Sequence, residues 1–343
     1  MPQTRLTPGS LLDDQGRLSM TGWATSLVRT YDRRMIRAGA LRIKEWDYYL
    51  IHDDHRAVAL TIDDNSYMGL LGISWLNFDV PREHTVNRMS FLPLGKTSLP
   101  PTSERGIVRW EDKHGFAEFE NDGTHRHLRA RLDNFDGGKP LSADLTLADF
   151  PADSMVIATP FPDAPRAFYY NQKIIGMRAS GTVHAGDEEY HFNPACSFGL
   201  LDWGRGVWTY DNVWFWCAAQ GQTDGHVFGF NLGYGFGDTS DASENMLFFD
   251  GRAHKLEQVD FGIPRQGAAY DLMSPWHFTS SDGRFDAIFT PILDRANCTD
   301  FKLILSDQHQ VFGHFSGRAV LDDGTEVVLR DFLGSAEVVH NKW

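Results

Sequence analysis

The fold can be read from residues 197–251, which are SFGLLDWGRGVWTYDNVWFWCAAQGQTDGHVFGFNLGYGFGDTSDASENMLFFDG. Within this stretch FGFNLGYGFGD (228–238) alternates large apolar side chains with glycine, as a β-strand does, since successive side chains of a strand point to opposite faces. Its glycine spacing does not fit a nucleotide-binding loop. One face carries mainly glycines and Asn231, which leaves room for a ligand or for a large side chain from a neighbouring strand. The other face carries Phe228, Phe230, Leu232, Tyr234 and Phe236.

The preceding run VWFWCAA (213–219) predicts a second strand. Trp214 and Trp216 share one of its faces, whereas Phe215 and Cys217 share the other. Tryptophans opposite a bare glycine face either fill the core of a barrel or wall a binding pocket in which Asn231 is the polar group. The sequence leaves both interpretations open.

The rest of the chain repeats this pattern. Turn sequences such as Asn121-Asp122-Gly123 and Ser281-Asp282-Gly283 separate short segments rich in β-branched and aromatic residues, such as RFDAIFTPI (284–292). Segments with helical periodicity are scarce, and we expect only a short helix around SLVRTYDRRMI (26–36). The chain is therefore predicted to be all-β, with antiparallel strands in meanders.

A shift in composition suggests how the chain is divided. Residues 133–166 are dense in Pro, Asp and Gly, and the sequence becomes more aromatic after them. We expect an N-terminal segment over residues 1–39, one β domain over 40–150 and a second over 165–343. A faint echo relates SGTVHAGDEEYHFNPACSFG (180–199) to SGRAVLDDGTEVVLRDFLGS (316–335), and it is either a repeat or the likeness of any two hairpins.

The charge balance excludes several classes of function. The 343 residues include 32 Lys and Arg against 46 Asp and Glu, a formal net charge of −14. Such a surface repels nucleic acid and anionic membranes. Apolar runs are too short for a membrane span or a signal peptide, and the cysteines are too few and scattered for a disulfide framework. We expect a cytoplasmic protein that neither inserts into membranes nor binds nucleic acid.

Polar side chains gather at the ends of the central strands, where a core alone would not need them. They are Asp202, Arg205, Tyr210, Asp238, Glu244 and Asn245. An acid beside Trp203 and Trp208 would be partly desolvated, which raises the pKa of a carboxyl group and favours proton donation. The alternative is a structural ion pair between Asp202 and Arg205.

A second polar group lies in SDQHQVFGHF (306–315). On a strand Asp307 and His309 share a face, so the carboxylate either orients the imidazole for acid–base chemistry or forms a structural hydrogen bond. His125 and His127 share a face in the same way but have no evident third ligand, so we expect no metal. No G-x-S-x-G elbow, P-loop or H-E-x-x-H motif is present, and no cofactor is indicated.

Several long motifs resemble those of a known family. They are YYNQKIIGMRASGTV, SFGLLDWGRGVW, GFNLGYGFGDTSDASENMLFFDG, PWHFTSSDGRFD and SDQHQVFGHFSGRAVLDDG. From about residue 44 to Trp343 the chain closely resembles an uncharacterised bacterial family, domain of unknown function 2804. That name implies no activity.

The order of the motifs also resembles the more distant carotenoid hydratase and AttH-like proteins. This resemblance implies two lipocalin-like β-barrels joined end to end, as in the calycins, and hydratase, isomerase or cyclase chemistry without a cofactor. It also implies proton donation by an Asp in a W-x-D-x-Y-like corner. Asp202 in Leu200-Leu201-Asp202-Trp203-Gly204 matches that acid, while the flanking Trp and Tyr are out of register.

These features together predict two tandem lipocalin-like (calycin-type) antiparallel β-barrels or half-barrels, with a pocket in the second or at their junction. The expected function is a cofactor-independent lyase or isomerase with hydratase-like acid–base chemistry on a hydrophobic, isoprenoid- or lipid-like molecule. Asp202 would protonate an alkene, and tryptophan faces would stabilise the carbocation. Its polar partners would be Arg205, Asp238, Glu244 or His309. The pocket would be lined by Trp203, Tyr210, Trp214, Trp216, Asn231, Asn245 and Tyr170.

Two other functions fit the same residues. The first is a non-catalytic lipid carrier, because many calycins are carriers. The second is a carbohydrate-active protein, because tryptophan platforms with nearby carboxylates also suit sugars.

Overall fold

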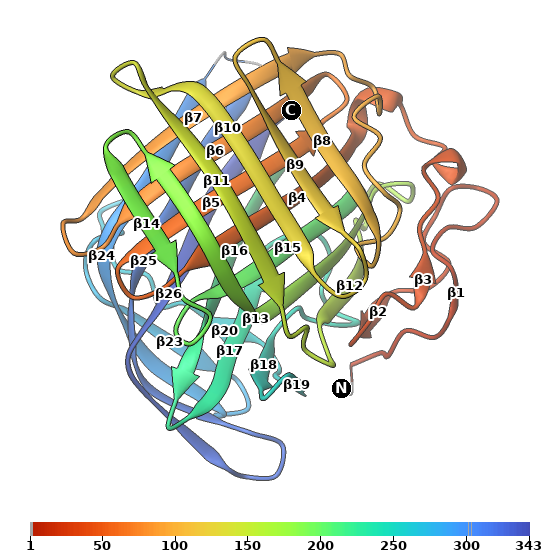
Figure 1. Ribbon diagram of the computed structural model, residues 1–343. Coiled ribbons are helices and arrows are strands. Elements are labelled where there is room, and N and C mark those ends of the chain that lie inside the picture. Colours follow the sequence, from red (N-terminus) through yellow and green to blue (C-terminus); the bar gives the residue numbers. More distant parts are fainter. Residues whose placement is uncertain (1–2, 301, 303) are drawn as a thin grey trace.

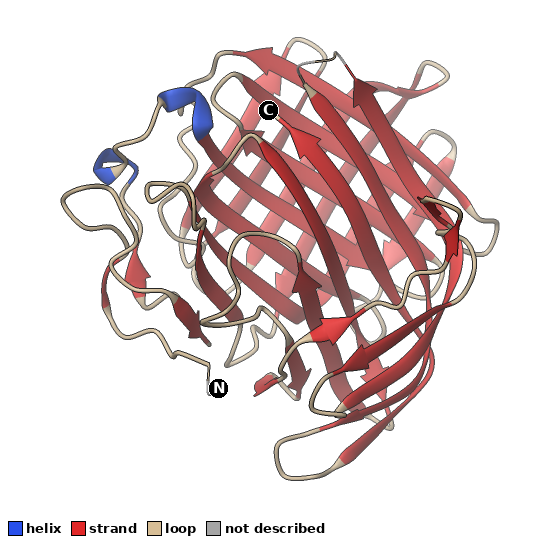
Figure 2. Ribbon diagram, turned by 180° about the vertical axis from the view of Figure 1, so that it is seen from behind, coloured by secondary structure: helices blue, strands red, loops and turns tan. Residues whose placement is uncertain are grey.

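The computed structural model describes residues 3–300, 302 and 304–343. It consists almost entirely of antiparallel strands, arranged in a curled 13-stranded sheet and a curled 9-stranded sheet (Figure 1, Figure 2). Among these residues the only helices are the 3-10 turns η1 (Arg33–Met35) and η2 (Ala40–Arg42), so the helix expected over 26–36 is reduced to a single short turn. The predicted all-β fold of two half-barrels is confirmed.

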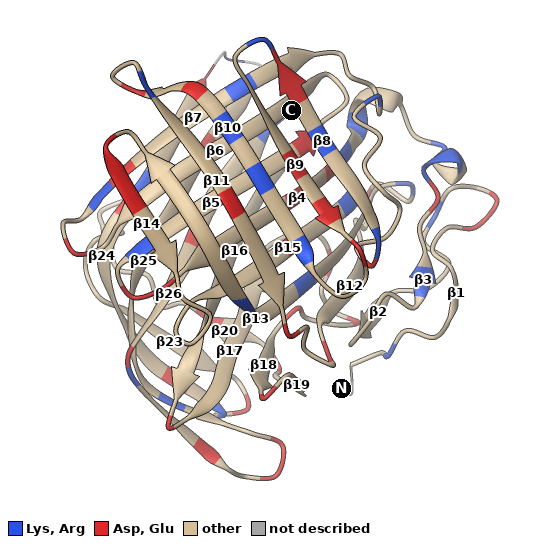
Figure 3. Cartoon of the chain, in the orientation of Figure 1, with Lys and Arg blue, Asp and Glu red and all other residues tan. Residues whose placement is uncertain are grey.

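The first sheet has the strand order β7-β6-β5-β4-β15-β13-β11-β10-β9-β8, and β2, β12 and β14 are attached to it. Strands β8 to β11 alternate buried apolar residues with more exposed, mainly polar ones, so one of their faces covers a core and the other meets water. Acidic and basic residues are interspersed along β8 to β10 (Figure 3), and Glu118 pairs with both Arg109 and Arg129. The strands are β2 (Gly22–Ala24), β4 (Ile43–His52), β5 (Arg56–Asp64), β6 (Met68–Asn77), β7 (Arg82–Phe91), β8 (Gly106–Asp112), β9 (Gly115–Asn121), β10 (Arg126–Asp136), β11 (Lys139–Ala148), β12 (Met155–Pro160), β13 (Phe168–Ala185), β14 (Glu188–Phe192) and β15 (Phe198–Val207).

The second sheet has the order β19-β18-β17-β16-β26-β25-β24-β23-β20. Its strands are β16 (Asp211–Thr223), β17 (His226–Tyr234), β18 (Met246–Phe249), β19 (Arg252–Lys255), β20 (Val259–Asp260), β23 (Trp276–Ser280), β24 (Phe285–Asp300), β25 (Leu305–Val320) and β26 (Glu326–Lys342). Short two-stranded sheets pair β1 (Gly9–Ser10) with β3 (Arg29–Thr30) and β21 (Arg265–Gln266) with β22 (Ala269–Tyr270).

The change from one sheet to the other falls between β15 and β16, at residues 208–210. The boundary expected at residues 150–165 does not divide the sheets, because β13 and β15 return to pair with β11 and β4. The Pro-, Asp- and Gly-rich stretch instead forms connections on either side of the short strand β12.

The two sheets repeat one topology. Each sheet begins with a meander of four strands, β4 to β7 in the first and β16 to β19 in the second. The later strands of each sheet add to the other side, and the last long strand pairs with the first strand of the meander. β15 closes on β4 in this way, and β26 closes on β16. When β15 and β26 are aligned on Gly199 and Gly334, Asp202 corresponds to Glu337 and Trp208 to Trp343. The echo in the sequence thus reflects a repeat of strand order.

The central strands use both of their faces. Phe228, Phe230 and Leu232 of β17 point into an aromatic core inside the second half-barrel, as the alternation predicts. Trp216 of β16 packs instead with the first sheet, at 6.3 Å from Tyr48. Every residue of β15 is buried, because one of its faces lines the first half-barrel and the other meets the second sheet.

Gly204 of β15 shows how tightly this contact is packed. It lies directly opposite Trp46 of β4, and a Cβ at Gly204 would coincide with the Trp46 indole. That indole stacks on Tyr169 at 5.9 Å and meets Trp208 edge-on at 5.4 Å. The absence of a side chain at Gly204 therefore allows the Trp46 indole to occupy this position, in contact with Tyr169 and Trp208.

We expect Gly204→Ala to lower the free energy of unfolding by about 1–3 kcal/mol, because overpacking forces the indole to move. Urea denaturation would measure this, with Gly39→Ala as control, since a Cβ at Gly39 meets no atom within 4 Å. Equal stability of the two variants would show that Trp46 is free to shift.

Candidate functional site

The two sheets meet through a set of side chains that we call the inter-sheet layer. On the first sheet, Lys173 of β13 and Tyr48 of β4 flank Asp202 of β15 in the strand register, so the three side chains share one face. On the second sheet, Gln310 and Trp216 flank Glu337 in the same way. The layer comprises Lys44, Trp46, Tyr48, Asp63, Asn171, Lys173, Asp202, Trp214, Trp216, Gln310, Glu337 and Asn341.

A buried ion pair lies at the centre of the layer. Lys173 is 2% exposed, and its Nζ lies 2.5 Å from Oδ2 of Asp202 and 4.0 Å from the centre of the Trp216 ring. Asn171 donates to Oδ1 of Asp202 at 2.6 Å and to the Trp203 carbonyl at 2.8 Å. Both carboxylate oxygens of Asp202 thus have a fixed donor.

A second chain of hydrogen bonds continues from Trp216. Its indole Nε1 donates to Oδ1 of Asn231 at 2.7 Å, and Nδ2 of Asn231 donates to Oε2 of Glu244 at 3.0 Å. Glu244 lies over Gly233 of the bare strand face, and Ile175 of β13 lies over Gly229. Large side chains thus occupy the face that the glycines leave free. Burial raises the pKa of Glu244, and the nearby Lys173 opposes the rise.

Glu337 is the acid that the second sheet supplies. Nε2 of Gln310 donates to its Oε1 at 2.7 Å, and Gln310 also donates to the Tyr48 hydroxyl at 3.2 Å. Burial raises the pKa of Glu337 to about 7, against the attraction of Arg295 and Lys173. A carboxyl group with such a pKa carries a proton near neutral pH and can give it to a bound molecule.

The contacts across the layer are reciprocal. Lys173 of the first sheet lies on Trp216 of the second, and Gln310 of the second sheet bonds to Tyr48 of the first. The two pairs are equivalent to each other, because Lys173 corresponds to Gln310 and Trp216 to Tyr48 in the repeated topology. The layer thus combines an ion pair, a carboxyl group that holds its proton near neutrality and several aromatic faces, and that set can move a proton at an apolar molecule.

Several of the predicted site residues do come together. Asp202, Trp216, Asn231 and Glu244 are linked through Lys173 and the hydrogen bonds described above. Trp214 lies on the same face of β16 as Trp216, 5.5 Å from Trp208 and 5.4 Å from Phe236.

Three predicted residues lie on the opposite side of the first sheet. Arg205 and Trp203 alternate with Asp202 on β15, so they point into the first half-barrel. Arg205 is fully buried and pairs with Asp47 at 2.9 Å, so the alternative ion pair with Asp202 does not form. Tyr170 packs on Trp203 and donates to the Arg29 carbonyl at 2.9 Å, which ties the N-terminal segment down.

The other predicted residues lie in loops, beside strand ends or, for His309, on the face of β25 that is turned away from the layer. Asp238 accepts from the Ser240 amide in its own turn at 2.9 Å, and this hydrogen bonding lowers its pKa. Asn245 bonds to the backbone of Gly233 and Glu257. Tyr210 lies 44% exposed in the β15–β16 connection. His309 points away from the layer and bonds to Asp294 at 2.7 Å, while Asp307 lies at 3.7 Å.

The sequence-based prediction missed Lys173, Glu337, Tyr48 and Gln310. A lone lysine within NQKIIG gives no local sign of burial. The signal that could have revealed Glu337 is the alignment of SFGLLDWGRGVW (197–208) with FLGSAEVVHNKW (332–343), in which Asp202 matches Glu337 and the final tryptophans coincide.

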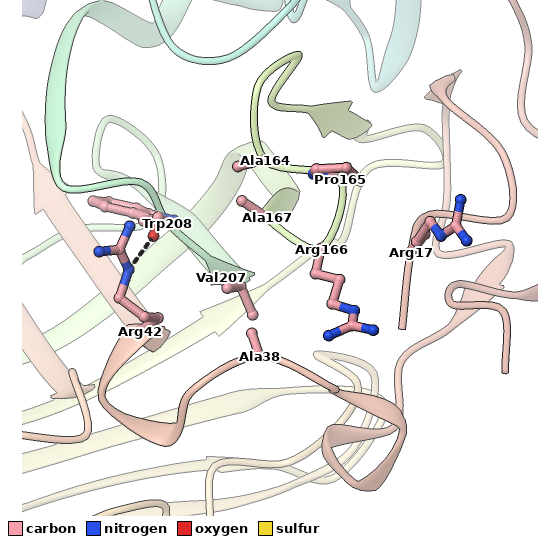
Figure 4. A pocket seen from close by; sticks show the side chains of 9 residues that line it. All are labelled: Arg17, Ala38, Arg42, Ala164, Pro165, Arg166, Ala167, Val207 and Trp208. Atoms are coloured by element: carbon pink, nitrogen blue, oxygen red, sulfur yellow. Dashed lines mark hydrogen bonds between the residues drawn. The ribbon is translucent and has the colours of Figure 1, made fainter. Parts of the chain in front are cut away.

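A hollow of about 610 Å³ adjoins one end of the layer (Figure 4). It is lined by Arg17, Ala38, Arg42, Ala164, Pro165, Arg166, Ala167, Val207 and Trp208. Trp208 links the hollow to the layer, because its ring also contacts Trp46 and Trp214, and its carbonyl accepts from Nε of Arg42 at 2.8 Å.

Neither a metal cluster nor a membrane-spanning helix is found in the part of the chain that the structure describes. Within residues 3–300, 302 and 304–343, no group of three or more His, Cys, Asp or Glu side chains could hold a metal ion. Over the same residues, no helix is long and apolar enough to cross a membrane.

Residues 3–343 match the family described as "Domain of unknown function (DUF2804)". The chain belongs to the DUF2804 family. No curated protein shows significant sequence similarity to this DUF2804 protein.

Solved structures that resemble this DUF2804 protein include an AttH-like protein from Nitrosomonas europaea. It is 13% identical, with a TM-score of 0.53 over 90% of this chain and 95% of that one. Kievitone hydratase from Nectria haematococca is 12% identical, with a TM-score of 0.47 over 93% of this chain and 97% of that one. CghA, solved with Sch210972, is 12% identical, with a TM-score of 0.48 over 97% of each chain. At such low identity the AttH-like structure bears on the fold alone, and it agrees with the predicted tandem arrangement.

We expect Lys173→Met to lower the free energy of unfolding of this DUF2804 protein by about 3–5 kcal/mol, because it leaves the Asp202 charge buried without its partner. The double variant Lys173→Met with Asp202→Leu should recover most of this loss, since no uncompensated charge remains. Equal stability of the single and double variants in urea denaturation would show that the pair contributes little.

Stability should also depend on pH through Glu337. Its pKa is higher in the folded chain than the ordinary 4.5, so its contribution is present below about pH 4.5 and is lost as the pH rises through about 7. Relative to wild type, Glu337→Gln should therefore gain up to about 3 kcal/mol in unfolding free energy between pH 5 and pH 8. A pH-independent difference would contradict the raised pKa.

Proposed function

We propose that this DUF2804 protein is a cofactor-independent acid–base enzyme, a lyase or isomerase with hydratase-like chemistry, that acts on a hydrophobic small molecule in the inter-sheet layer. The observation that carries this proposal is the position of Lys173 and Asp202, which are buried, and of Glu337, which is half-buried, among tryptophans where the two sheets meet.

The energetics of burial support a functional reason for these groups. A charge taken out of water costs several kcal/mol unless it is paired, and apolar side chains in the same places would also hold two sheets together. Asp202 and Lys173 offset part of this cost for each other, whereas Glu337 is hydrogen-bonded by the neutral side chains of Gln310 and Trp214. Perturbed ionisable groups of this kind are typical of sites that transfer protons.

The geometry supports a division of roles between the two acids. Glu337 suits the donor, because a carboxyl group with a pKa of about 7 can protonate an alkene carbon or a carbonyl oxygen near neutral pH. Asp202, held by Lys173 and Asn171, suits the acceptor. It would take a proton from a neighbouring carbon, which completes an isomerisation, or from an attacking water, which completes a hydration. This assignment moves the donor role that the sequence suggests for Asp202 to its counterpart Glu337.

The aromatic side chains of the layer are suited to stabilise a cationic intermediate. A ring face attracts positive charge, and the contact of Lys173 with Trp216 at 4.0 Å is an example within the layer itself. Trp46 and Trp214 supply further faces nearby. Protonation of an isoprenoid alkene next to these rings would place the carbocation where it is stabilised.

The test is proton exchange in D2O with purified full-length protein. Any co-purified small molecule is first identified by native mass spectrometry and extraction, and that molecule and a panel of isoprenoid alkenes are then incubated with the protein. We expect deuterium incorporation or hydration for at least one compound, with losses of about 100-fold or more in Asp202→Asn and Glu337→Gln. Asp238→Asn is the matched control, since it makes the same chemical change outside the layer.

A bound lipid that neither incorporates deuterium nor is converted would indicate that the protein is a non-catalytic lipid carrier instead. Full activity in both Asp202→Asn and Glu337→Gln would remove the inter-sheet layer as the site. A bound sugar would favour the carbohydrate-active alternative.

A further inference from the structure

A second set of polar side chains lies in the inter-sheet layer, away from the proton-transfer groups and close to the hollow beside Trp208. Its centre is Lys44, which is 1% exposed and whose Nζ donates to the carbonyls of Leu41 at 3.3 Å and Asn65 at 3.1 Å. That Nζ also lies 4.2 Å from the centre of the Tyr67 ring and 5.5 Å from that of Trp343. Among the described residues, no carboxylate forms an ion pair with Lys44.

Polar atoms without a hydrogen-bond partner in the described protein concentrate around this lysine. An unpartnered buried polar group costs about 1–3 kcal/mol, and native structures contain few of them. Several such atoms at one place indicate that a polar group binds there. They are Oδ1 of Asp63, the hydroxyl of Tyr67, both side-chain polar atoms of Asn341, and the indole nitrogens of Trp208 and Trp343.

Contacts hold these atoms in one region. Trp343 stacks on Trp208 at 6.0 Å between ring centres, and Trp208 lines the hollow of Figure 4. Asn341 is completely buried and lies two residues before Trp343 on the same face of the chain. Asp63 interacts electrostatically with both Lys44 and Tyr67.

The chemistry of the free atoms selects the kind of group that fits. Most of these atoms are hydroxyl, amide and indole N–H donors, so a group that binds here must accept hydrogen bonds. A hydroxyl group can in addition donate to the carboxyl and amide oxygens. Burial lowers the pKa of Lys44 to about 7 and raises that of Asp63 to about 8, so neither sign of charge dominates. A phosphate or an ammonium group would find no fixed counter-charge here.

We infer that the cluster of Lys44, Asp63, Tyr67 and Asn341 binds the oxygen-bearing end of the substrate, a hydroxyl or carbonyl group on an isoprenoid- or lipid-like body. The inference rests on the proposed function and deepens it, because it assigns an oxygenated substrate rather than a pure hydrocarbon. The apolar body would then run along Trp208 and Trp46 towards Lys173 and Asp202.

The test compares a matched pair of probes, the isoprenoid alcohol farnesol and the hydrocarbon farnesene, by tryptophan fluorescence quenching. Wild type should bind farnesol about 10-fold or more tightly than farnesene, since the hydrocarbon leaves the buried polar atoms unpaired. Lys44→Met should reduce this preference to within about threefold.

Tyr67→Phe keeps the inference testable if Lys44→Met fails to fold. It removes only an unpartnered hydroxyl, so it should leave the melting temperature unchanged or raise it, while weakening farnesol binding about 3- to 10-fold and leaving farnesene unaffected. Lys96→Met in an exposed loop is the control for Lys44→Met and should behave as wild type.

Equal affinity of wild type for both probes, no binding of either, or an unchanged preference in Tyr67→Phe would each overturn the inference. Deuterium incorporation that depends on Asp202 and Glu337 is measured separately. Its persistence alongside any of these results would leave the proposed function standing and reject only the recognition site.

Discussion

The whole site depends on two long-range strand pairings, β15 with β4 and β26 with β16. All ten residues of Phe198–Val207 pair with Ile43–His52, and this register puts Asp202 between Tyr48 and Lys173. A slip of one residue would turn each side chain to the other face and remove the ion pair from the layer. The packing of Trp46 on Gly204 opposes such a slip, because only a glycine leaves space for the indole.

The repeated topology gives the layer two equivalent halves with different chemistry. The first half presents a carboxylate with a lysine and a tyrosine, and the second presents a carboxyl group with a glutamine and a tryptophan. Lys173 balances the charge of Asp202, whereas Gln310 offers Glu337 a hydrogen bond without a charge. One scaffold used twice thus places an ion pair beside an acid that keeps its proton to near neutrality, which identical halves would not provide.

Local alternation predicted much of this arrangement. The faces of β16 and β17, the association of Trp216 with Asn231, and the all-β fold follow from period-two patterns that a sequence displays directly. The same alternation puts Arg205 and Trp203 on the face opposite Asp202. Their closeness to Asp202 in the sequence therefore does not bring them into the layer, and their prediction as site residues is wrong in this respect.

Other features depend on pairing between strands that are distant in the sequence, so local sequence patterns do not predict them. Lys173 resembles a solvent-exposed lysine until β13 is known to lie beside β15 with the second sheet above it. The sheet boundary was misplaced for the same reason, since only the return of β15 to β4 shows that residues 168–207 belong to the first sheet. The unpartnered atoms around Lys44 likewise come from β5, β26 and the residues that follow β5, β15 and β26, which only the folded chain brings together.

Proton transfer in the layer requires that Glu337, between the two sheets, holds its proton near neutral pH. A carbon-13 NMR titration of protein labelled at the glutamate side-chain carboxyl measures this directly, with Glu337→Gln used to assign the resonance. We expect the resonance missing from the variant to titrate near pH 7. A midpoint near 4.5, the ordinary value for a solvated glutamate, would contradict it.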